Sequence, residues 1–420
     1  MSNELDRLLG PARLAGLTLR NRVIKTATFE GMCPGGVPGD DLIRHHAGMA
    51  RGGVGLTTVA YCGVSPDGLT FPDQMWMHGG VFAQLQRLAE AVHAEGGAVS
   101  AQLAHCGYFS RNKPRGIPRP RGPSACINQY GVFSGVPFGG AMDRKDIDRT
   151  VAEYAAAASL VRDAGFDAIE IHMGHGYLLS QFISPLLNRR RDDYGGSLEN
   201  RMRLPLQVLA AVRAAVGKDF PLLAKLNLSD GLAEGLGIDE SCRAAQWLEQ
   251  GGLDAIVMSG GLVSRTSMFL FRGESPLPSM IPLEKNRLQR TAMKWFGAAA
   301  FPSMPYEELY FLKMAREMRR AVRMPLVYLG GVATAESMGR AMAEGFDFIA
   351  MGRALLNDPN LLQRLAEQGP AWKSACTHCN QCVASMGLPG GIRCTGLARE
   401  AVRPFAGKPA PTTNGSTHSL

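Results

Sequence analysis

The sequence lacks the features that mark membrane-spanning and secreted chains. No run approaches the roughly 18 uninterrupted apolar residues of a membrane span, and the N-terminal stretch MSNELDRLLG carries charges where a secretory signal needs an apolar segment. We therefore expect a cytoplasmic protein with no membrane partner. In a reducing compartment its 9 cysteines are predicted to be thiols or metal ligands.

Aromatic residues and net charge are also scarce. Aromatics make up 7% of the 420 residues, and Lys plus Arg exceed Asp plus Glu by 45 to 37, which gives a formal charge of +8. So small a surplus favours phosphate-bearing ligands slightly and argues against nucleic acid as a partner. The densest basic stretch is interleaved with prolines and is interpreted as a solvated loop or, alternatively, a contact for an anionic substrate: Arg111, Lys113, Arg115, Arg119 and Arg121.

What the chain does contain is an internal repeat. The segments AGFDAIEI (164–171), GGLDAIVM (251–258) and EGFDFIAM (344–351) are near copies of one phrase. Each is predicted to be a helix-capping glycine that leads directly into a short buried strand.

Further apolar runs raise the number of expected strands to eight. They lie at 22–28, 54–60, 98–103, 222–226 and 326–329, and stretches of helical period lie between the strands at 40–50, 82–94, 147–163, 203–216, 240–250, 306–321 and 335–343. Eight continuous apolar strands alternating with helices predict an α/β fold, a (β/α)8 TIM barrel, here with a short cysteine-rich C-terminal extension.

The sequence is predicted to form three parts. We expect a barrel over 1–370, a cysteine-rich metal-binding extension over 371–400, and a disordered tail over 401–420, which has no apolar period. Two long segments, 106–143 and 262–305, follow the third and sixth strands. In a barrel both would lie over the catalytic face as lids.

Two imidazoles and a phenol follow the fourth predicted strand: His172, His175 and Tyr177. Barrel enzymes keep their catalytic residues at the carboxyl ends of the strands. Gly174 and Gly176 allow a tight turn, neutral imidazoles can donate hydrogen bonds to one developing oxyanion, and a tyrosine can supply a proton. We interpret the group as catalytic, although a lone histidine would more often be structural.

The residues around this group resemble the signature of the old yellow enzyme family of FMN-dependent oxidoreductases. The resemblance rests on HMGHGYLLSQFISPLLN (172–188) and RDDYGGSLENRMR (191–203), and it extends over about residues 5–365 through LRNRV (19–23), RGGVGL (51–56), QLAH (102–105), YLGGV (328–332) and MGRALL (351–356).

The resemblance implies roles for individual residues. His172 and His175 would bind a carbonyl or nitro oxygen of the substrate, and Tyr177 would deliver a proton. FMN would be held at its pyrimidine and N1/O2 edge and at its phosphate by Thr26, Gln102, Lys225, Gly330, Gly331, Gly352 and Arg353. Phe29 departs from the family pattern, since many members carry Thr or Cys at that position.

Four cysteines close to the C-terminus form a metal-ligand pattern: Cys376, Cys379, Cys382 and Cys394. Thiolates at this spacing can enclose tetrahedral zinc or an iron-sulfur cluster. The array is similar to the motif that holds a [4Fe-4S] centre in larger members of the family, 2,4-dienoyl-CoA reductase and trimethylamine dehydrogenase. Iron-sulfur, zinc and an empty site all stay open here.

Three functional hypotheses follow. The first is an FMN enzyme that passes hydride from NAD(P)H to an activated C=C bond in an enone, enoate or nitro compound. The second is a dehydrogenase of an amine or another donor, in which electrons leave FMN through the cluster to a separate electron-transfer partner. The third is a non-catalytic, zinc-stabilised barrel that binds a polyanion. The first two involve a small-molecule substrate, and all three are compatible with a homo-oligomer.

Overall fold

The computed structural model describes residues 2–71, 73–112 and 119–396. The tail predicted over 401–420 lies outside these residues, as do Lys113 and Arg115 of the basic stretch. The predicted boundary at residue 370 between barrel and extension stays a prediction.

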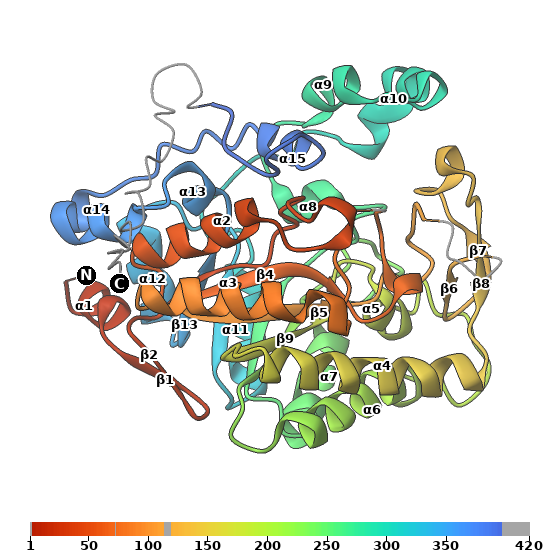
Figure 1. Cartoon of the computed structure of the whole chain (residues 1–420), viewed down its shortest axis with the longest axis horizontal. Coiled ribbons are helices and arrows are strands. Elements are labelled where there is room, and N and C mark those ends of the chain that lie inside the picture. Colours follow the sequence, from red (N-terminus) through yellow and green to blue (C-terminus); the bar gives the residue numbers. More distant parts are fainter. Residues whose placement is uncertain (1, 72, 113–118, 397–420) are drawn as a thin grey trace, which may run out of the picture.

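Eight parallel strands form a closed barrel, in which the last strand pairs with the first (Figure 1). All eight strands expected from the apolar runs are present. They are β3 (Val23–Lys25), β4 (Leu56–Gly63), β5 (Ala98–Ala104), β9 (Ala168–Met173), β10 (Leu222–Asn227), β11 (Ala255–Ser259), β12 (Leu326–Leu329) and β13 (Phe348–Met351).

Helices cover the outside of the barrel (Figure 1). They are α2 (Asp40–Arg51), α3 (Phe82–Ala94), α4 (Arg144–Asp163), α6 (Leu198–Val216), α7 (Ile238–Gln250), α11 (Leu312–Ala321) and α12 (Ala335–Ala343). The helix expected from residue 306 begins only at Leu312. The preceding backbone is diverted at Leu309, which has a φ of 56° and donates its N–H to Gly331 O at 2.9 Å.

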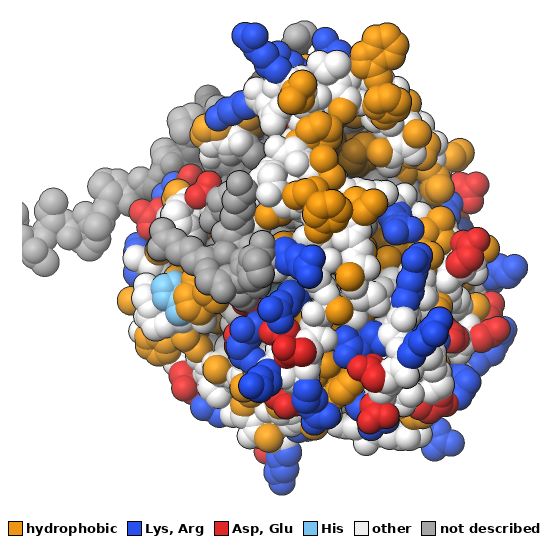
Figure 2. Space-filling view, turned by 90° about the vertical axis from the view of Figure 1, so that its right-hand side faces the viewer, with side chains coloured by type: hydrophobic (Ala, Val, Ile, Leu, Met, Phe, Trp, Pro, Cys, Tyr) orange, Lys and Arg blue, Asp and Glu red, His pale blue; other side chains and the backbone are white. Residues whose placement is uncertain are grey.

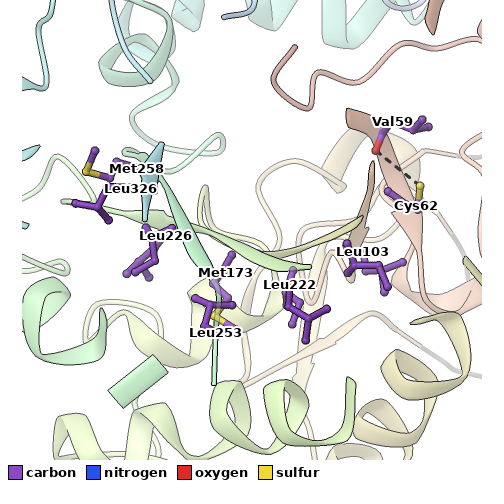
Figure 3. Close-up of a cluster of buried hydrophobic side chains, with 14 of the residues drawn as sticks. Val59, Cys62, Leu103, Met173, Leu222, Leu226, Leu253, Met258 and Leu326 are labelled. Atoms are coloured by element: carbon purple, nitrogen blue, oxygen red, sulfur yellow. Dashed lines mark hydrogen bonds between the residues drawn. The ribbon is translucent and has the colours of Figure 1, made fainter. Parts of the chain in front are cut away.

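The barrel has two hydrophobic cores. One lies between strands and helices and contains long side chains such as Leu103, Met173 and Leu226 (Figure 3). The other fills the barrel interior, where the first residues of several strands, among them Leu56 and Phe348, pack against the N-terminal hairpin of β1 (Ala12–Leu14) and β2 (Leu17–Leu19). The hairpin therefore closes the amino end of the barrel.

Each copy of the repeated segment forms a turn that links two neighbouring strands by hydrogen bonds. Its glycines adopt left-handed conformations, with φ of 87° at Gly165, 86° at Gly252 and 83° at Gly345, which an L side chain would resist. Each following aspartate accepts a hydrogen bond from the first or second residue of the adjacent strand and donates its own N–H to the same residue: Asp167 with Val99, Asp254 with Leu222, and Asp347 with Leu326.

Two insertions project from the end of the barrel opposite the hairpin (Figure 1). The segment after β5 contains a three-stranded sheet of β6 (Arg121–Gly122), β7 (Cys126–Ile127) and β8 (Phe138–Ala141), and the segment after β11 contains α8 (Ser267–Phe271), α9 (Leu277–Met280) and α10 (Arg287–Ala300). The sequence predicted both lids but not their secondary structure.

The remaining elements are short. They include α1 (Ser2–Leu9), α5 (Leu178–Ile183), α13 (Arg353–Asn357), α14 (Leu361–Gln368) and, within the cysteine-rich extension, α15 (Gln381–Ser385). Across the described ranges, no helix combines the length and the apolar character needed to cross a bilayer.

Candidate active site

A cavity of about 1290 Å³ lies at the carboxyl ends of the strands. Barrel residues, both insertions and the cysteine-rich extension contribute to its lining. Hydrophobic side chains gather in the upper part of the face shown in Figure 2. The most exposed large hydrophobic residues belong to the insertions, and include Leu288, Trp295 and Phe296 of α10.

The structure brings the three predicted catalytic residues together. The ring centroids of His172 and Tyr177 are 4.4 Å apart in a stacked arrangement, and those of His172 and His175 are 5.0 Å apart, edge to face. All three side chains are buried. His175 and Tyr177 line the cavity, and His172 packs against both rings.

Hydrogen bonds assign the free ring nitrogens of the two histidines. Gly174 N donates to His172 Nδ1 at 3.3 Å, so the proton lies on Nε2, which has no partner among the described residues. His175 Nε2 pairs with Ser259 Oγ at 2.8 Å, which leaves Nδ1 for a bound molecule. One nitrogen on each ring is thus available to a ligand.

Burial controls the charge of this group. Burial, and to a lesser extent His175 and Lys225, hold the pKa of His172 well below its usual value, and burial with Lys225 lowers the pKa of His175 to about 3. Burial raises the pKa of Tyr177 well above its ordinary value. Near neutral pH the site therefore holds two neutral imidazoles and a protonated phenol.

Tyr61 is a site residue that was not predicted from the sequence. It lies on β4, lines the cavity, and has its ring centroid 5.0 Å from that of Tyr177. Phe29, the residue that departs from the family pattern, stacks on Tyr61 at 5.7 Å and on Phe71 at 4.9 Å. The available signal was an aromatic residue directly after the strand predicted over 54–60, in a chain with few aromatics.

A second aromatic wall runs from Tyr177 into the insertion that follows β5. Phe109 meets Tyr177 edge to face at 6.0 Å and stacks on Tyr130 at 4.3 Å. Both Phe109 and Tyr130 line the cavity. This side of the cavity is therefore lined by aromatic rings from Tyr177 outward.

A buried polar network matches the predicted flavin edge. Lys225 Nζ donates to Thr26 Oγ1 at 3.1 Å and forms an ion pair with Glu170 Oε1 at 3.0 Å, and Gln102 Nε2 donates to the same carboxylate oxygen. Gln102 Oε1 is buried and has no partner among the described residues. A free acceptor beside a cation fits the pyrimidine ring of a flavin, which presents an N–H between two carbonyl oxygens.

The predicted phosphate residues also line the cavity: Gly330, Gly331, Gly352 and Arg353. Gly330 and Gly331 have φ of 132° and 76°, conformations that favour glycine. The hydrogen bonds of Arg353 use only its Nη1 atom, which donates to Arg272 O and Asn380 Oδ1, both at 2.7 Å. The other guanidinium nitrogens are free of protein hydrogen bonds in the described residues and fit an anionic group.

The four C-terminal cysteines are free, half-buried thiols. Burial, and to a lesser extent the other three thiols, raise the pKa of Cys382 to about 11 against the lowering effect of the Arg353 charge, so the four thiols lie near one another. A single zinc ion needs sulfurs about 3.8 Å apart. Within the described ranges, only Glu30, His45 and His46 form a group of three Cys, His or acidic ligand atoms that all lie within 4.8 Å of one another. No three of the four thiols do so. The thiols are therefore spaced more widely than around one zinc ion.

A buried ion pair lies beside this last group. Lys25 Nζ pairs with Glu30, whose other carboxylate oxygen accepts a hydrogen bond from Ala60 N at 3.0 Å. Although burial alone would raise it, the charge of Lys25 lowers the pKa of Glu30 to about 2. Because the Lys25 ammonium already neutralises Glu30, the group with His45 and His46 is not a plausible cation site.

These features define a flavin oxidoreductase of the barrel class. The chain belongs to the NADH:flavin oxidoreductase / NADH oxidase family, whose family model matches residues 7–267. The protein is therefore an enzyme, and the non-catalytic alternative does not hold. The cysteine motif is not confirmed by this match.

Curated relatives agree with the family. The chain is 42% identical over 395 residues to 4,4'-dithiodibutanoate disulfide reductase of Rhodococcus erythropolis, covering 93% of this chain and 95% of that protein. It is 32% identical to a metal reductase of Desulforamulus reducens, covering 89% of this chain and 51% of that protein. The chain thus spans about half the length of some relatives.

Solved structures share the fold. The old yellow enzyme homologue from Zymomonas mobilis is 25% identical, with a TM-score of 0.68 over 88% of this chain and 95% of that one. Morphinone reductase in complex with tetrahydroNAD is also 25% identical, with a TM-score of 0.67 over 88% of this chain and 92% of that one.

Proposed function

We propose that the protein is an FMN-dependent oxidoreductase that uses hydride from NAD(P)H to reduce an activated C=C bond in an enone, an enoate or a nitro compound. The observation that carries this proposal is the convergence of three side chains: His175 and Tyr177 line the cavity, and His172 packs directly against both of them. The free acceptor of Gln102 and the cation of Lys225 lie in the same cavity, where the flavin edge is expected.

Each residue has a role that its chemistry supports. FMN, which Gln102, Lys225 and Arg353 would hold, would supply the chemistry for hydride transfer from NAD(P)H to the β-carbon of the acceptor. The Nε2–H of His172 and the free nitrogen of His175 hydrogen-bond to the carbonyl or nitro oxygen and so withdraw electrons from the double bond. Because both imidazoles are neutral, the proton for the α-carbon comes from the hydroxyl of Tyr177.

Tyr177→Phe tests this assignment. We expect the variant to slow acceptor reduction by roughly 100-fold, because general acid catalysis contributes at least that much, and to leave flavin reduction by NAD(P)H within about twofold. Stopped-flow absorbance measures the two half-reactions separately. Tyr130→Phe, which removes another hydroxyl from the same cavity, is the matched control. Equal slowing of both half-reactions, or no slowing, would contradict the proposal.

An organic disulfide is the second candidate acceptor. It is supported by the 42% identical relative, which is named for a disulfide substrate and matches over nearly its whole length. Two electrons and two protons convert one disulfide into two thiols, so the same proton donor would serve. The two candidates can be compared directly by supplying NAD(P)H with either an enone or 4,4'-dithiodibutanoate. Loss of the alkene measures the first reaction, and release of thiol measures the second.

We further propose that Cys376, Cys379, Cys382 and Cys394 bind one metal centre, an iron-sulfur cluster in preference to zinc. The support is the chemistry of four free thiols together with a spacing wider than that around one zinc ion. Asn357 Nδ2 donates to Cys394 Sγ at 3.4 Å, a contact suited to a bound thiolate.

A further inference from the structure

The proposed function leaves one cation of the cavity without a role. Five cationic side chains line it: Arg44, Arg111, Lys225, Lys285 and Arg353. Arg44 and Lys225 form ion pairs with carboxylates, Lys285 is exposed to solvent, and Arg353 accompanies the phosphate-site glycines. Arg111 remains.

The partners of Arg111 are all neutral. Its Nε donates to Ser134 Oγ at 3.2 Å, its Nη2 donates to Gln289 Oε1 at 3.3 Å, and its guanidinium carbon lies 5.7 Å from the centroid of the Tyr130 ring. No carboxylate lies within 4.0 Å of it across the described ranges. Glu284 lines the same cavity, but its Oε1 accepts from Asn286 N at 2.8 Å.

An uncompensated guanidinium that is only partly solvated gains most from an anionic partner. Arginine offers a planar set of N–H donors that matches a carboxylate in two-point contact. The present acceptors, a hydroxyl and an amide, bind a cation less strongly than a carboxylate does. Both belong to the insertions: Ser134 lies between β7 and β8, and Gln289 lies on α10.

The aromatic wall connects Arg111 to the reacting centre. Phe109 contacts the Tyr177 ring on one side and Tyr130 on the other, and the Arg111 guanidinium lies beside Tyr130. A bound molecule that follows this wall has its reducible bond beside Tyr177, an apolar spacer against the aromatic rings, and its far end at the guanidinium.

We propose that Arg111 binds a carboxylate of the acceptor, so that the preferred substrates carry an anionic group joined by a short apolar spacer to the bond that is reduced. This inference rests on the proposed function and specifies its substrate class. It makes Arg111 a specificity-determining residue that does not take part in the transfer of hydride or proton.

The test compares two acceptors that differ only in charge. These are 4-maleimidobutanoate, in which three methylenes join a carboxylate to the nitrogen of a maleimide ring that contains an activated C=C bond, and its methyl ester. We expect Arg111→Gln to raise KM for the acid by about 10- to 100-fold with little change in kcat, and to change kcat/KM for the ester by less than about threefold. Arg111→Lys, which keeps the charge but not the planar fork, should give an intermediate KM.

Arg44→Gln is the matched control, because Arg44 also lines the cavity but is paired with Asp41. This variant should leave the ratio of kcat/KM for the acid to kcat/KM for the ester unchanged. Flavin content and melting temperature establish that each variant is folded. The proposal is wrong if Arg111→Gln lowers kcat/KM for the acid and for the ester equally, or lowers neither value. It is also wrong if Arg44→Gln changes the ratio of the two kcat/KM values as much as Arg111→Gln does.

A binding measurement separates this inference from the proposed function. The saturated analogues, 4-succinimidobutanoate and its methyl ester, need no turnover, and their dissociation constants can be measured from perturbation of the flavin absorbance. A wild-type preference for the acid that disappears in Arg111→Gln supports Arg111 even if no alkene is reduced. The absence of such a preference overturns the inference even if the alkenes are reduced.

Discussion

The buried pair of Lys25 and Glu30 allows a stability prediction with a calculable size. Both side chains are only 1% exposed. Glu30→Gln keeps an acceptor for Ala60 N but leaves the Lys25 ammonium without a counter-charge in the protein interior. Breaking a buried pair in this way costs about 3–5 kcal/mol.

The pKa of Glu30 gives an independent figure. Its lowering from 4.5 to about 2 corresponds to about 3 kcal/mol of stabilisation at neutral pH, at 1.36 kcal/mol per pKa unit. A chain of this length has an unfolding entropy of about 0.9 kcal/mol per kelvin. We therefore expect Glu30→Gln to lower the melting temperature by about 3 to 6 °C at pH 7.

The pH dependence follows from the sign of the shift. Because the pKa of Glu30 is lower in the folded protein than its ordinary value of 4.5, its stabilisation is complete above pH 4.5 and is lost as the pH falls toward 2. The difference between wild type and Glu30→Gln should therefore shrink over that range. Scanning calorimetry at several pH values measures it.

The double variant Lys25→Met with Glu30→Gln is the control. It removes the stranded ammonium as well, so it should recover most of the stability that Glu30→Gln loses. A loss below about 1 °C in the single variant would refute the reasoning. So would a double variant whose loss equals the sum of the two single losses, since that result means that the two side chains do not interact.

Four further predictions concern the site. Bound flavin should be FMN and noncovalent; chromatography of the supernatant after denaturation checks this, and FAD or a coloured precipitate would contradict it. Lys225→Met should weaken FMN binding by roughly 10- to 100-fold, since it removes a charge-assisted contact and strands Glu170; fluorescence titration measures the change, and unaltered affinity would contradict the assignment. Anaerobic protein should contain about four irons per chain with a reducible signal in electron paramagnetic resonance, and Cys379→Ser should lose them; one zinc without iron would indicate a structural site, and neither metal would rule out the proposal. With the pKa of His175 at about 3, acceptor kcat/KM should show no imidazole titration between pH 5 and 9, whereas a break near pH 6.5 that disappears in His175→Asn would contradict a neutral imidazole.

The barrel was predictable because its strands and helices are encoded locally. Continuous apolar runs gave all eight strands, and the boundaries of the helix at Phe82–Ala94 and the strand at Leu326–Leu329 match those observed. The secondary structure of the two lids was not predictable. The strand β6 has only two residues, too few to show a period, and α10 leaves Leu288 and Trp295 exposed, so burial in the barrel core specifies neither element.

The same contrast holds for the site. His172, His175 and Tyr177 are close in sequence, so their convergence was predictable from one turn. Glu170 and Tyr61 were missed, because their partners come from other strands and their proximity arises only when the barrel closes. Glu170 did carry a signal, since a carboxylate within the apolar strand Ala168–Met173 needs a buried partner.

The aspartate-containing turns of the repeated segment have a consequence for engineering. They tie the strands together in pairs, β5 with β9, β10 with β11 and β12 with β13, at the amino ends, away from the cavity. The insertions leave the barrel at the opposite ends of the strands, so the parts that shape the pocket share no residue with the parts that fasten the barrel. Lids from related enzymes could therefore be grafted after β5 and β11 as interchangeable segments. Variants could then be selected for new acceptors while the aspartate hydrogen bonds that hold the strands together stay unchanged.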